Sequence, residues 1–271
     1  MAPLISVVIP TCDRHDMLQE TLGSLRKQTA LPAEVIVADN GAVPAALAWA
    51  SYPFAVRHHR IGVRVGASRA RNAGAAAAAG RYIAFLDDDD FWEADYLERL
   101  AALLARDPGA MPAMVVARID HLDNGHRHPF RFAGDDPRLE PCFYFNPGYL
   151  GSAITVEKAA FLALGGFDAA FRTGEDKELA IRFMLERLRI VYDRELCAIN
   201  RVHAASLSRE IDSLTEARLL LQKHGRRVSF GVRMRTLREG YKKARKKRYF
   251  IHKLLLKLLL MAVPMSPKKG L

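Results

Sequence analysis

Residues 82–92 read Tyr-Ile-Ala-Phe-Leu-Asp-Asp-Asp-Asp-Phe-Trp, so four consecutive carboxylates follow an apolar run. The apolar part is rich in aromatic and branched side chains, which predicts a buried strand. Four like charges at the end of such a strand repel one another, and their desolvation costs free energy unless a cation shares the site. Carboxylate oxygens favour Mg²⁺ or Mn²⁺, which keep coordination positions free for phosphate oxygens. Taken alone, the four consecutive aspartates, the acidic run, also fit a solvated turn before a helix that starts near Ala94.

Length and cysteine content limit the class of protein. The chain has 271 residues, half of them hydrophobic, which suffices for one domain or two small ones. Its three cysteines, Cys12, Cys142 and Cys197, lack the spacing of a metal site or a disulfide framework. The first residues lack the basic segment and cleavage site of a signal peptide and have the pattern of a strand. We therefore expect a cytoplasmic protein with reduced thiols.

The net charge of +11 comes from the C-terminal part of the chain. Residues 232–271 hold thirteen of the 41 Lys and Arg residues but one of the 30 acidic residues. The rest of the chain is therefore close to neutral. The basic charge is a property of a tail and not of the surface around the acidic run.

The tail consists of a basic block, 242–248, followed by an apolar stretch, 251–263. This stretch is shorter than the roughly 20 residues that span a bilayer and is interrupted by Lys253 and Lys257. As a helix it would be amphipathic, which favours a peripheral position on the inner leaflet of a membrane with anionic lipids. A terminal helix packed on the core is the main alternative, and nucleic acid is disfavoured as a partner. We predict a globular domain over residues 1–225 and a basic amphipathic helical tail over residues 226–271.

Strand and helix patterns alternate along the body of the chain, as in an α/β domain. Predicted strands cover Leu4–Ile9, Glu34–Ala38, a short segment with Arg57, and Tyr82–Leu86; predicted helices cover a segment with Met17, Leu18, Leu22 and Leu25, and Ala67–Ala79. Polar residues follow three of these strands: Thr11, Asp13 and Arg14, then Asp39 and Asn40, then Asp87 to Asp90. Because ligands of open parallel sheets bind outside the carboxyl ends of the strands, we expect one site there.

Five segments in fixed order carry a specific resemblance. They are ISVVIPTCDR from residue 5, VIVADNG from residue 35, GASRARNAGAAAAAGRYIAFLDDDDFW from residue 66, GGFDAAFRTGEDKELAIRF from residue 165 and INRVHAASLS from residue 199. Across about residues 4–208 the chain resembles a family 2 glycosyltransferase of the GT-A fold. The resemblance implies a Rossmann-like mixed sheet flanked by helices. It also implies metal-dependent transfer of one sugar from a nucleotide-sugar donor with inversion, using Mn²⁺ or Mg²⁺.

The resemblance also implies a nucleotide site with Pro10, Thr11, Asp13, Asp39 and Arg71. The hydroxyl of Thr11 can hydrogen-bond to the nucleotide, and Asp39 can accept a hydrogen bond from the imide N–H of uracil, which favours a UDP-sugar. Many relatives carry a second Asp and a Ser where this chain has Asn40 and Ala42, so dTDP and GDP donors stay open. The Asp39-Asn-Gly sequence is also a simple turn signal.

The metal site implied by the resemblance lies in the acidic run. The DxD pattern of the family maps best to Asp87 and Asp89, with Asp89 as the preferred metal ligand and Asp87 or Asp88 at the ribose. The repetition leaves the register open to Asp88 and Asp90. Arg201 and His203, with Ser206 and Ser208, match a late motif that closes over the donor phosphates. His203 would complete the metal shell or bind the diphosphate, with a structural histidine as the alternative.

Two acidic residues, Glu175 and Asp176, open a helix whose buried face is predicted to carry Leu179, Phe183, Met184 and Leu188. The resemblance makes Asp176 the catalytic base that takes a proton from the acceptor hydroxyl, and Glu175 the residue that orients the acceptor. Acidic residues in a first turn are also favoured by the helix dipole alone.

The acceptor side of the site matches the family least, over residues 107–150. Within it, 120–129 is predicted as an exposed acceptor-side loop, and its histidines, His121, His126 and His128, are not expected to bind zinc. The basic tail suggests a lipid-linked glycan or a cell-surface polysaccharide as acceptor, and a homodimer stays open. A phosphotransferase is disfavoured because Phe91 and Trp92 follow the acidic run, and a noncatalytic binding protein because both sets of carboxylates are present.

Overall fold

A computed structural model describes residues 4–107, 109–203 and 213–246. The described residues form two compact units, one within residues 1–142 and 146–209 and the other within residues 143–145 and 210–271. Ser206, Ser208 and the apolar stretch 251–263, to which we assigned roles above, lie outside the described residues.

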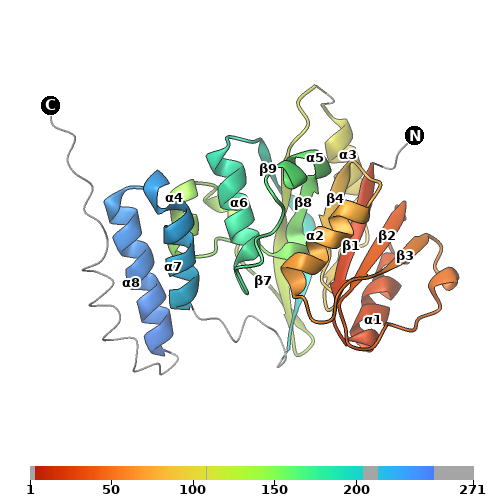
Figure 1. The fold of residues 1–271 in the computed structure, drawn as a ribbon. Helices are drawn as coiled ribbons and strands as arrows, with labels where there is room; N and C mark the ends of the chain where they lie inside the picture. The colour runs from red at the N-terminus through yellow and green to blue at the C-terminus, as the bar shows by residue number, and fades with distance from the viewer. Residues whose placement is uncertain (1–3, 108, 204–212, 247–271) are drawn as a thin grey trace. The chain divides into compact units, whose positions relative to one another are not determined.

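The first unit is built on one mixed sheet (Figure 1). Within the described residues, nine strands form it in the order β3-β2-β1-β4-β8-β6-β9-β5, and β7 pairs with β6. The strands are β1 (Ile5–Thr11), β2 (Glu34–Asp39), β3 (Ala55–Arg60), β4 (Tyr82–Phe85), β5 (Phe91–Trp92), β6 (Met114–Asp123), β7 (His126–Pro129), β8 (Ile154–Glu157) and β9 (Ile190–Val202). The first four are mutually parallel, and β8 joins them antiparallel to β4. The predicted mixed sheet is therefore confirmed.

Strand β1 lies at the centre of the parallel part and is buried along its whole length. Its pairing with β4 ends at Val8, whereas its pairing with β2 continues to Thr11. Pro10 has no N–H to donate, and it is tolerated here because the strand no longer pairs with β4 at that position. The backbone beyond Val8 is thus open on one side, where the acidic run leaves β4.

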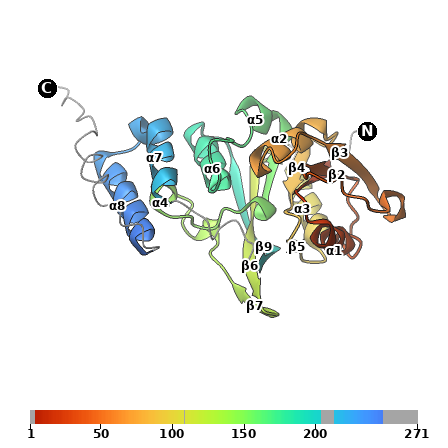
Figure 2. The ribbon, with the colours of Figure 1, turned by 60° about the horizontal axis from the view of Figure 1, so that its bottom comes forward.

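Helices cover both faces of this sheet (Figure 2). They are α1 (His15–Leu25) and α3 (Tyr96–Ala105) on one face, and α2 (Ala67–Ala77) and α5 (Lys158–Ala163) on the other, with α6 (Glu175–Leu185) following in the chain. Val7 shares a core with Leu18, Leu22 and Leu25 of α1. A Cβ atom on Gly74 of α2 would lie 2.5 Å from Val8. Because Val7 and Val8 point to opposite faces of the sheet, α1 and α2 lie on opposite sides of it.

The segment 120–129, predicted as an exposed loop, is instead a β-hairpin of β6 and β7. Asn124 and Gly125 form its tight turn with φ angles of 49° and 78°. Asn-Gly is favoured in two-residue hairpin turns because both residues tolerate positive φ, and this signal was missed. The prediction of exposure holds for β7, whose four residues are all exposed.

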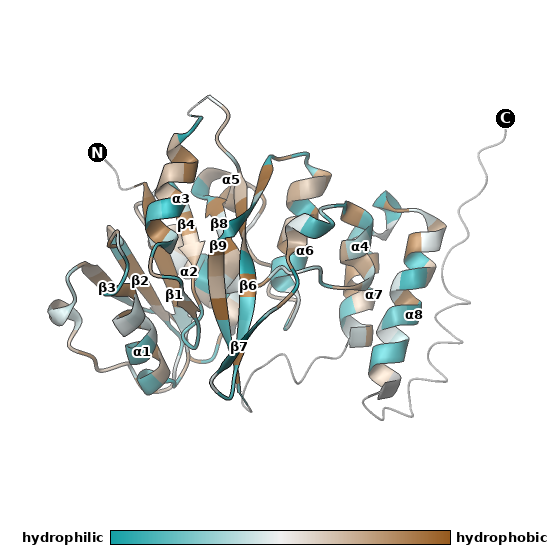
Figure 3. Cartoon of the chain, turned by 180° about the vertical axis from the view of Figure 1, so that it is seen from behind, coloured by the Kyte–Doolittle hydropathy of each residue, from teal (hydrophilic) through white to brown (hydrophobic). Residues whose placement is uncertain are grey.

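The second unit contains α7 (Ser213–His224), the short helix η5 (Gly225–Arg227) and α8 (Phe230–Lys246), together with residues 143–145 at the end of α4 (Leu139–Tyr144). Gly240 permits the close approach of α7 and α8, since a Cβ atom there would lie 2.9 Å from the carbonyl oxygen of Ser213. The boundary predicted at residue 226 falls within η5, whereas the structure groups α7 with α8. Apolar and polar residues alternate around α8 (Figure 3). Among the described residues, no helix is long and apolar enough to cross a bilayer.

Candidate functional site

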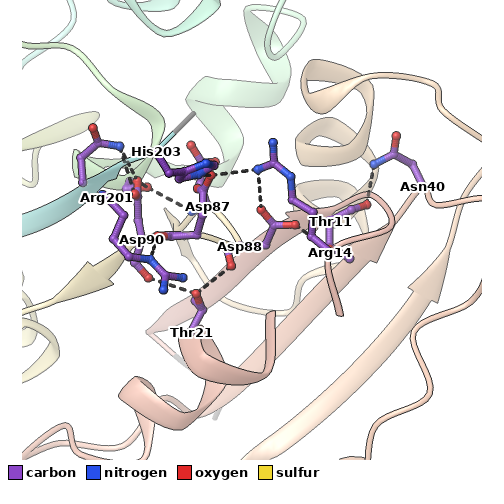
Figure 4. Close-up of polar contacts among 12 residues, drawn as sticks. Thr11, Arg14, Thr21, Asn40, Asp87, Asp88, Asp90, Arg201 and His203 are labelled. Carbon is purple, nitrogen blue, oxygen red and sulfur yellow. Dashed lines mark hydrogen bonds and ion pairs between the residues drawn. The ribbon is translucent and has the colours of Figure 1, made fainter. Parts of the chain in front are cut away.

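The four carboxylates that follow β4 differ in exposure. Asp88 and Asp90 are buried, with 5% and 1% of their surface exposed. The side chains of Asp87 and Asp89 keep 28% and 14% of their surface exposed. The alternation means that Asp87 and Asp89 are more accessible to an ion than Asp88 and Asp90 are. Figure 4 shows the contacts of this run with the segments around it.

Asp90 is held by donors from the protein itself. It accepts hydrogen bonds from Ser152 Oγ at 2.6 Å, Asn200 Nδ2 at 3.0 Å and the backbone N–H of Arg201 at 3.0 Å. Burial raises the pKa of Asp90 well above its ordinary value, and the negative charges of neighbouring aspartates add to this effect. Asp90 therefore joins the acidic run to β9 and to the segment before β8.

Asp88 lies beside the carboxyl end of β1, where the hydroxyl of Thr11 donates a hydrogen bond to it at 2.7 Å. The guanidinium of Arg14 is 3.4 Å from its other oxygen. Burial, and next the charge of Asp89, raise the pKa of Asp88 to about 6. The hydroxyl of Thr21 on α1 donates to the backbone carbonyls of Asp88 and Asp90 at 2.9 and 3.1 Å, which holds the turn of the run (Figure 4).

The two accessible carboxylates have cationic partners. Arg71 Nη2 donates to Asp87 at 2.6 Å, and Arg14 Nη1 donates to Asp89 at 2.8 Å. His203 Nε2 lies 2.9 Å from Asp89, although 114 residues separate the two in sequence. The structure thus brings the three predicted metal ligands together. His203 contacts Asp89 directly, and Asp87 lies two residues before Asp89 in the acidic run.

The donor set of this cluster suits a hard divalent cation. Asp87, Asp89 and Asp90 each offer a carboxylate oxygen, and these atoms lie within 4.8 Å of one another. Carboxylate oxygen and imidazole nitrogen are both ligands of Mn²⁺, and Mg²⁺ prefers the oxygens. Asp90 is buried and accepts three hydrogen bonds from the protein, whereas Asp87 and Asp89 keep more of their surface exposed, so Asp87 and Asp89 are the more accessible ligands for an ion.

Arg201 supports the acidic run from β9. Its Nε donates to the backbone carbonyl of Asp89, and its Nη1 pairs with Glu20 of α1. Its guanidinium lies over the ring of Phe91, 4.4 Å from the centroid. These partners are all protein groups, so the predicted contact of Arg201 with the nucleotide stays a prediction.

A cavity of about 560 Å³ opens beside the run, at the carboxyl ends of β1 and β2. It is bordered by six of the predicted nucleotide-binding residues: Pro10, Thr11, Asp13, Arg71, Asp87 and Asp88. Arg64 and Arg172 also border it and were not predicted. Each stands alone in a loop, without a local pattern that distinguishes it from a surface arginine. The structure therefore places two further cationic side chains, Arg64 and Arg172, beside the carboxylates that were predicted to lie at this cavity.

Asp39 does not border this cavity and is 1% exposed. Its carboxylate accepts from the backbone N–H groups of Gly41 and Ala45, both at 2.9 Å, and contacts His58 and Arg60, both at 2.8 Å. Burial by itself would raise the pKa of Asp39, but these four contacts together lower it to about 2. The predicted hydrogen bond to uracil stays a prediction, and Asp39 has a clear structural role beside it.

We expect Asp39→Ala to lower the free energy of unfolding by about 2–4 kcal/mol, because the amides of Gly41 and Ala45 lose their acceptor. The folded-state pKa is below the unfolded value, so the stabilisation is present above about pH 4 and is lost as the pH falls towards 2. Urea denaturation at pH 7 and pH 3 measures both effects. Asp136→Ala, which removes an exposed pair with Arg138, is the control and should change stability little.

The predicted catalytic carboxylates lie in the first turn of α6, directly after Gly174 in a left-handed conformation with φ 77°. Asp176 is 7% exposed and accepts from the backbone N–H of Lys177 at 2.6 Å. Burial raises the pKa of Asp176 well above its ordinary value, and the negative charge of Glu175 raises it further. A carboxyl group with a raised pKa is suited to accept a proton near neutral pH.

The buried face of α6 differs in part from the prediction. Leu179 and Phe183 are buried as expected, and so are Ala180 and Ile181. Met184 is half-buried, and Leu188 lies beyond the end of the helix at Leu185. The helix is buried on more than one side because it lies within the unit, so a simple one-face pattern does not describe it.

Comparisons with known proteins point to one family. The sequence model described as glycosyl transferase family 2 matches residues 6–170. An uncharacterized glycosyltransferase of Haemophilus influenzae is 26% identical over 184 residues, covering 68% of this chain and 63% of that protein. Validoxylamine A glucosyltransferase of Streptomyces hygroscopicus subsp. limoneus is 30% identical, covering 78% and 54%. The chain thus spans somewhat more than half the length of these curated relatives.

Among solved structures, the chain is similar to residues 1–349 of S. aureus TarS in complex with UDP-GlcNAc. The TM-score is 0.67 at 17% sequence identity, and the match covers 89% of this chain and 72% of that chain. At this identity the similarity concerns the fold alone.

Proposed function

Because the chain belongs to glycosyl transferase family 2, we propose that it transfers a single sugar from a nucleotide-sugar, first of all a UDP-sugar, to a hydroxyl group of a glycan or lipid-linked acceptor. The observation that supports this most is the convergence of Thr11, Arg71 and Asp87 on one cavity at the carboxyl ends of parallel strands. Hydroxyl and guanidinium donors beside accessible carboxylates suit a nucleotide diphosphate with its cation. The similar TarS structure holds UDP-GlcNAc, which supports uridine as the first base to test.

In the proposed reaction, Asp176 takes the proton of the acceptor hydroxyl as this oxygen attacks the anomeric carbon. Its raised pKa makes the ionised form a stronger base than an ordinary aspartate. A divalent cation held by Asp87, Asp89 and His203 would offset the charge of the departing nucleotide diphosphate. Because the proposal gives the attack to the acceptor oxygen and the proton transfer to Asp176, the reaction is a direct displacement, which inverts the anomeric configuration.

Calorimetric titration of UDP with and without Mn²⁺, followed by measurement of UDP release from a panel of UDP-sugars, tests this proposal. We expect UDP to bind, Mn²⁺ to strengthen the binding, and one sugar to be consumed faster than the others. GDP, dTDP and CMP are titrated in parallel. Tight binding of one of these in place of UDP would reject the uridine donor, and binding of none would reject the transferase proposal for this chain.

We propose further that the second unit holds the protein at a membrane surface, on the cytoplasmic side. Arg235, Arg238 and Lys242 of α8 are exposed and recur at helical spacing, so they lie on one face. Phe230 at the start of α8 is 54% exposed. An exposed row of cations, of which Lys242 also pairs with Glu239, on a helix that starts with an exposed apolar residue fits the headgroup region of a bilayer with anionic lipids.

Replacement of Arg238 and Lys242 by Glu should weaken sedimentation with phosphatidylserine vesicles at least about tenfold, because each nearby cation contributes on the order of 1 kcal/mol. Arg26 and Lys27, which are exposed in the first unit, give a control variant with the same charge change. Deletion of residues 242–271 should have a larger effect than either. Unchanged sedimentation of the deleted protein would exclude residues 242–271 as a membrane anchor, and unchanged sedimentation of both variants would exclude the second unit.

A further inference from the structure

Two consecutive residues of α2, Arg71 and Asn72, join segments that are distant in sequence. Arg71 Nη2 donates to Asp87 in the acidic run at 2.6 Å, and Arg71 Nη1 donates to Glu175 at the start of α6 at 2.8 Å. Asn72 Nδ2 donates to the carbonyl oxygen of Phe167 at 2.8 Å, and the N–H of Phe167 donates back to Asn72 Oδ1 at 2.8 Å. The pair therefore contacts both the donor side and the base side of the proposed site.

The surroundings of the pair leave it little freedom to move. Arg71 is 5% exposed, and its guanidinium lies 5.3 Å from the ring centroid of Phe167. A Cβ atom on Gly151 would lie 3.0 Å from Arg71 Nη2, and one on Gly166 would lie 2.5 Å from Asn72 Oδ1. Both side chains are thus packed against glycines, where a larger residue would displace them.

Arg71 borders the donor cavity and is also held by the protein itself. Both terminal nitrogens already donate to protein carboxylates, and the buried Nε has no hydrogen-bond partner among the described residues. A guanidinium can bridge two separate carboxylates because its planar group presents several N–H donors in fixed directions, which an ammonium cannot do. The bridge fixes the distance between Asp87 and Glu175.

We propose that Arg71 and Asn72 are positioning residues that hold the first turn of α6, and with it Asp176, at a fixed place relative to Asp87. Arg71 holds the carboxylate of Glu175, and Asn72 holds the backbone at Phe167, eight residues before α6 begins. Asp176 is adjacent to Glu175, so a shift of that turn displaces the base. This inference rests on the proposed function, since it assigns the base to Asp176 and the donor to the Asp87 side.

The inference separates transfer from donor binding. A displacement of the base by about 1 Å costs on the order of 100-fold in rate. Asn72→Ala, which leaves every residue that borders the donor cavity in place, should therefore lower kcat about 100-fold, whereas the affinity for UDP with Mn²⁺ stays within about threefold of wild type. Arg71→Lys should lower kcat at least as much and should also weaken UDP binding, because Arg71 borders the cavity. Arg69→Lys, at an exposed position of the same helix, is the matched control and should change neither quantity.

An equal loss of UDP affinity and kcat/KM in Asn72→Ala would overturn the inference, because the substitution would then act on donor binding and not on the position of the base. A double-mutant cycle of thermal midpoints for Arg71→Lys, Glu175→Gln and the double variant measures the coupling between Arg71 and Glu175 without any transfer assay. We expect the double variant to be about as stable as the less stable of the two single variants, because both substitutions break the same ion pair. Additive shifts of the thermal midpoint would overturn the inference, whatever the activity of the protein. A wild-type protein that bound UDP but transferred no sugar would reject the proposed function separately.

Discussion

Asp176→Asn should lower kcat by about 10²–10⁴-fold and leave the affinity for UDP unchanged, because the amide cannot take the proton of the acceptor hydroxyl. The carboxylate lies in the first turn of α6, is 7% exposed and is not among the residues that border the donor cavity. Steady-state kinetics with the sugar donor identified by the screen, together with UDP calorimetry, measure both quantities. A parallel loss of UDP binding would mean that Asp176 belongs to the donor site.

The same variant should be as stable as wild type at pH 7, or more stable. The folded state raises the pKa of Asp176 above its unfolded value, so ionisation of this carboxyl costs folding free energy as the pH rises through the raised pKa. An amide of the same size removes that cost. The acidic limb of the wild-type pH profile for kcat should accordingly lie above the ordinary range for an aspartate, about pH 4. Asp107→Asn, an exposed carboxyl that accepts from Gly109 and Ala110 after α3, is the control for both measurements.

Asp89→Ala should abolish the effect of Mn²⁺ on UDP binding, which we expect to appear as a loss of at least about 100-fold in affinity when the metal is present. Asp89 is the carboxylate that contacts both Arg14 and His203, so its removal takes a ligand from the centre of the cluster. Its side chain is partly exposed, and the unfolding midpoint in urea should change little. UDP affinity that still depends on Mn²⁺ in this variant would contradict the assignment.

The contrasting variant is Asp90→Ala, one residue further along. Three donors, Ser152 Oγ, Asn200 Nδ2 and the N–H of Arg201, would lose a buried acceptor. The free energy of unfolding should fall by about 2–4 kcal/mol. Asp89→Ala is thus expected to lose metal-dependent UDP binding and keep its stability, whereas Asp90→Ala is expected to lose stability. If Asp89→Ala destabilised the protein as much as Asp90→Ala, the two carboxylates would not differ in role.

Much of the fold followed from patterns within short segments. The predicted strand Leu4–Ile9 is β1, buried along its length, because a continuous apolar run ended by a proline is typical of the centre of a parallel sheet. The predicted helix 67–79 is α2, which ends two residues earlier, at Ala77. The segment 120–129 was predicted as an exposed loop because its residues are mostly polar, whereas the Asn-Gly turn at 124–125 makes it the hairpin of β6 and β7.

Sequence alone determined the family, the order of strands and helices from β1 to β4, and the edge of the sheet where the site lies. These follow from local apolar periodicity and from the rule that ligands bind at the carboxyl ends of parallel strands. The tertiary structure alone decided which of four identical aspartates face inward, since burial of Asp90 depends on Ser152 and Asn200, far along the chain. It also decided that Arg71 bridges Asp87 and Glu175, a contact across 104 residues. Chemically identical neighbours acquire different roles through long-range packing, and no pattern within a segment contains that information.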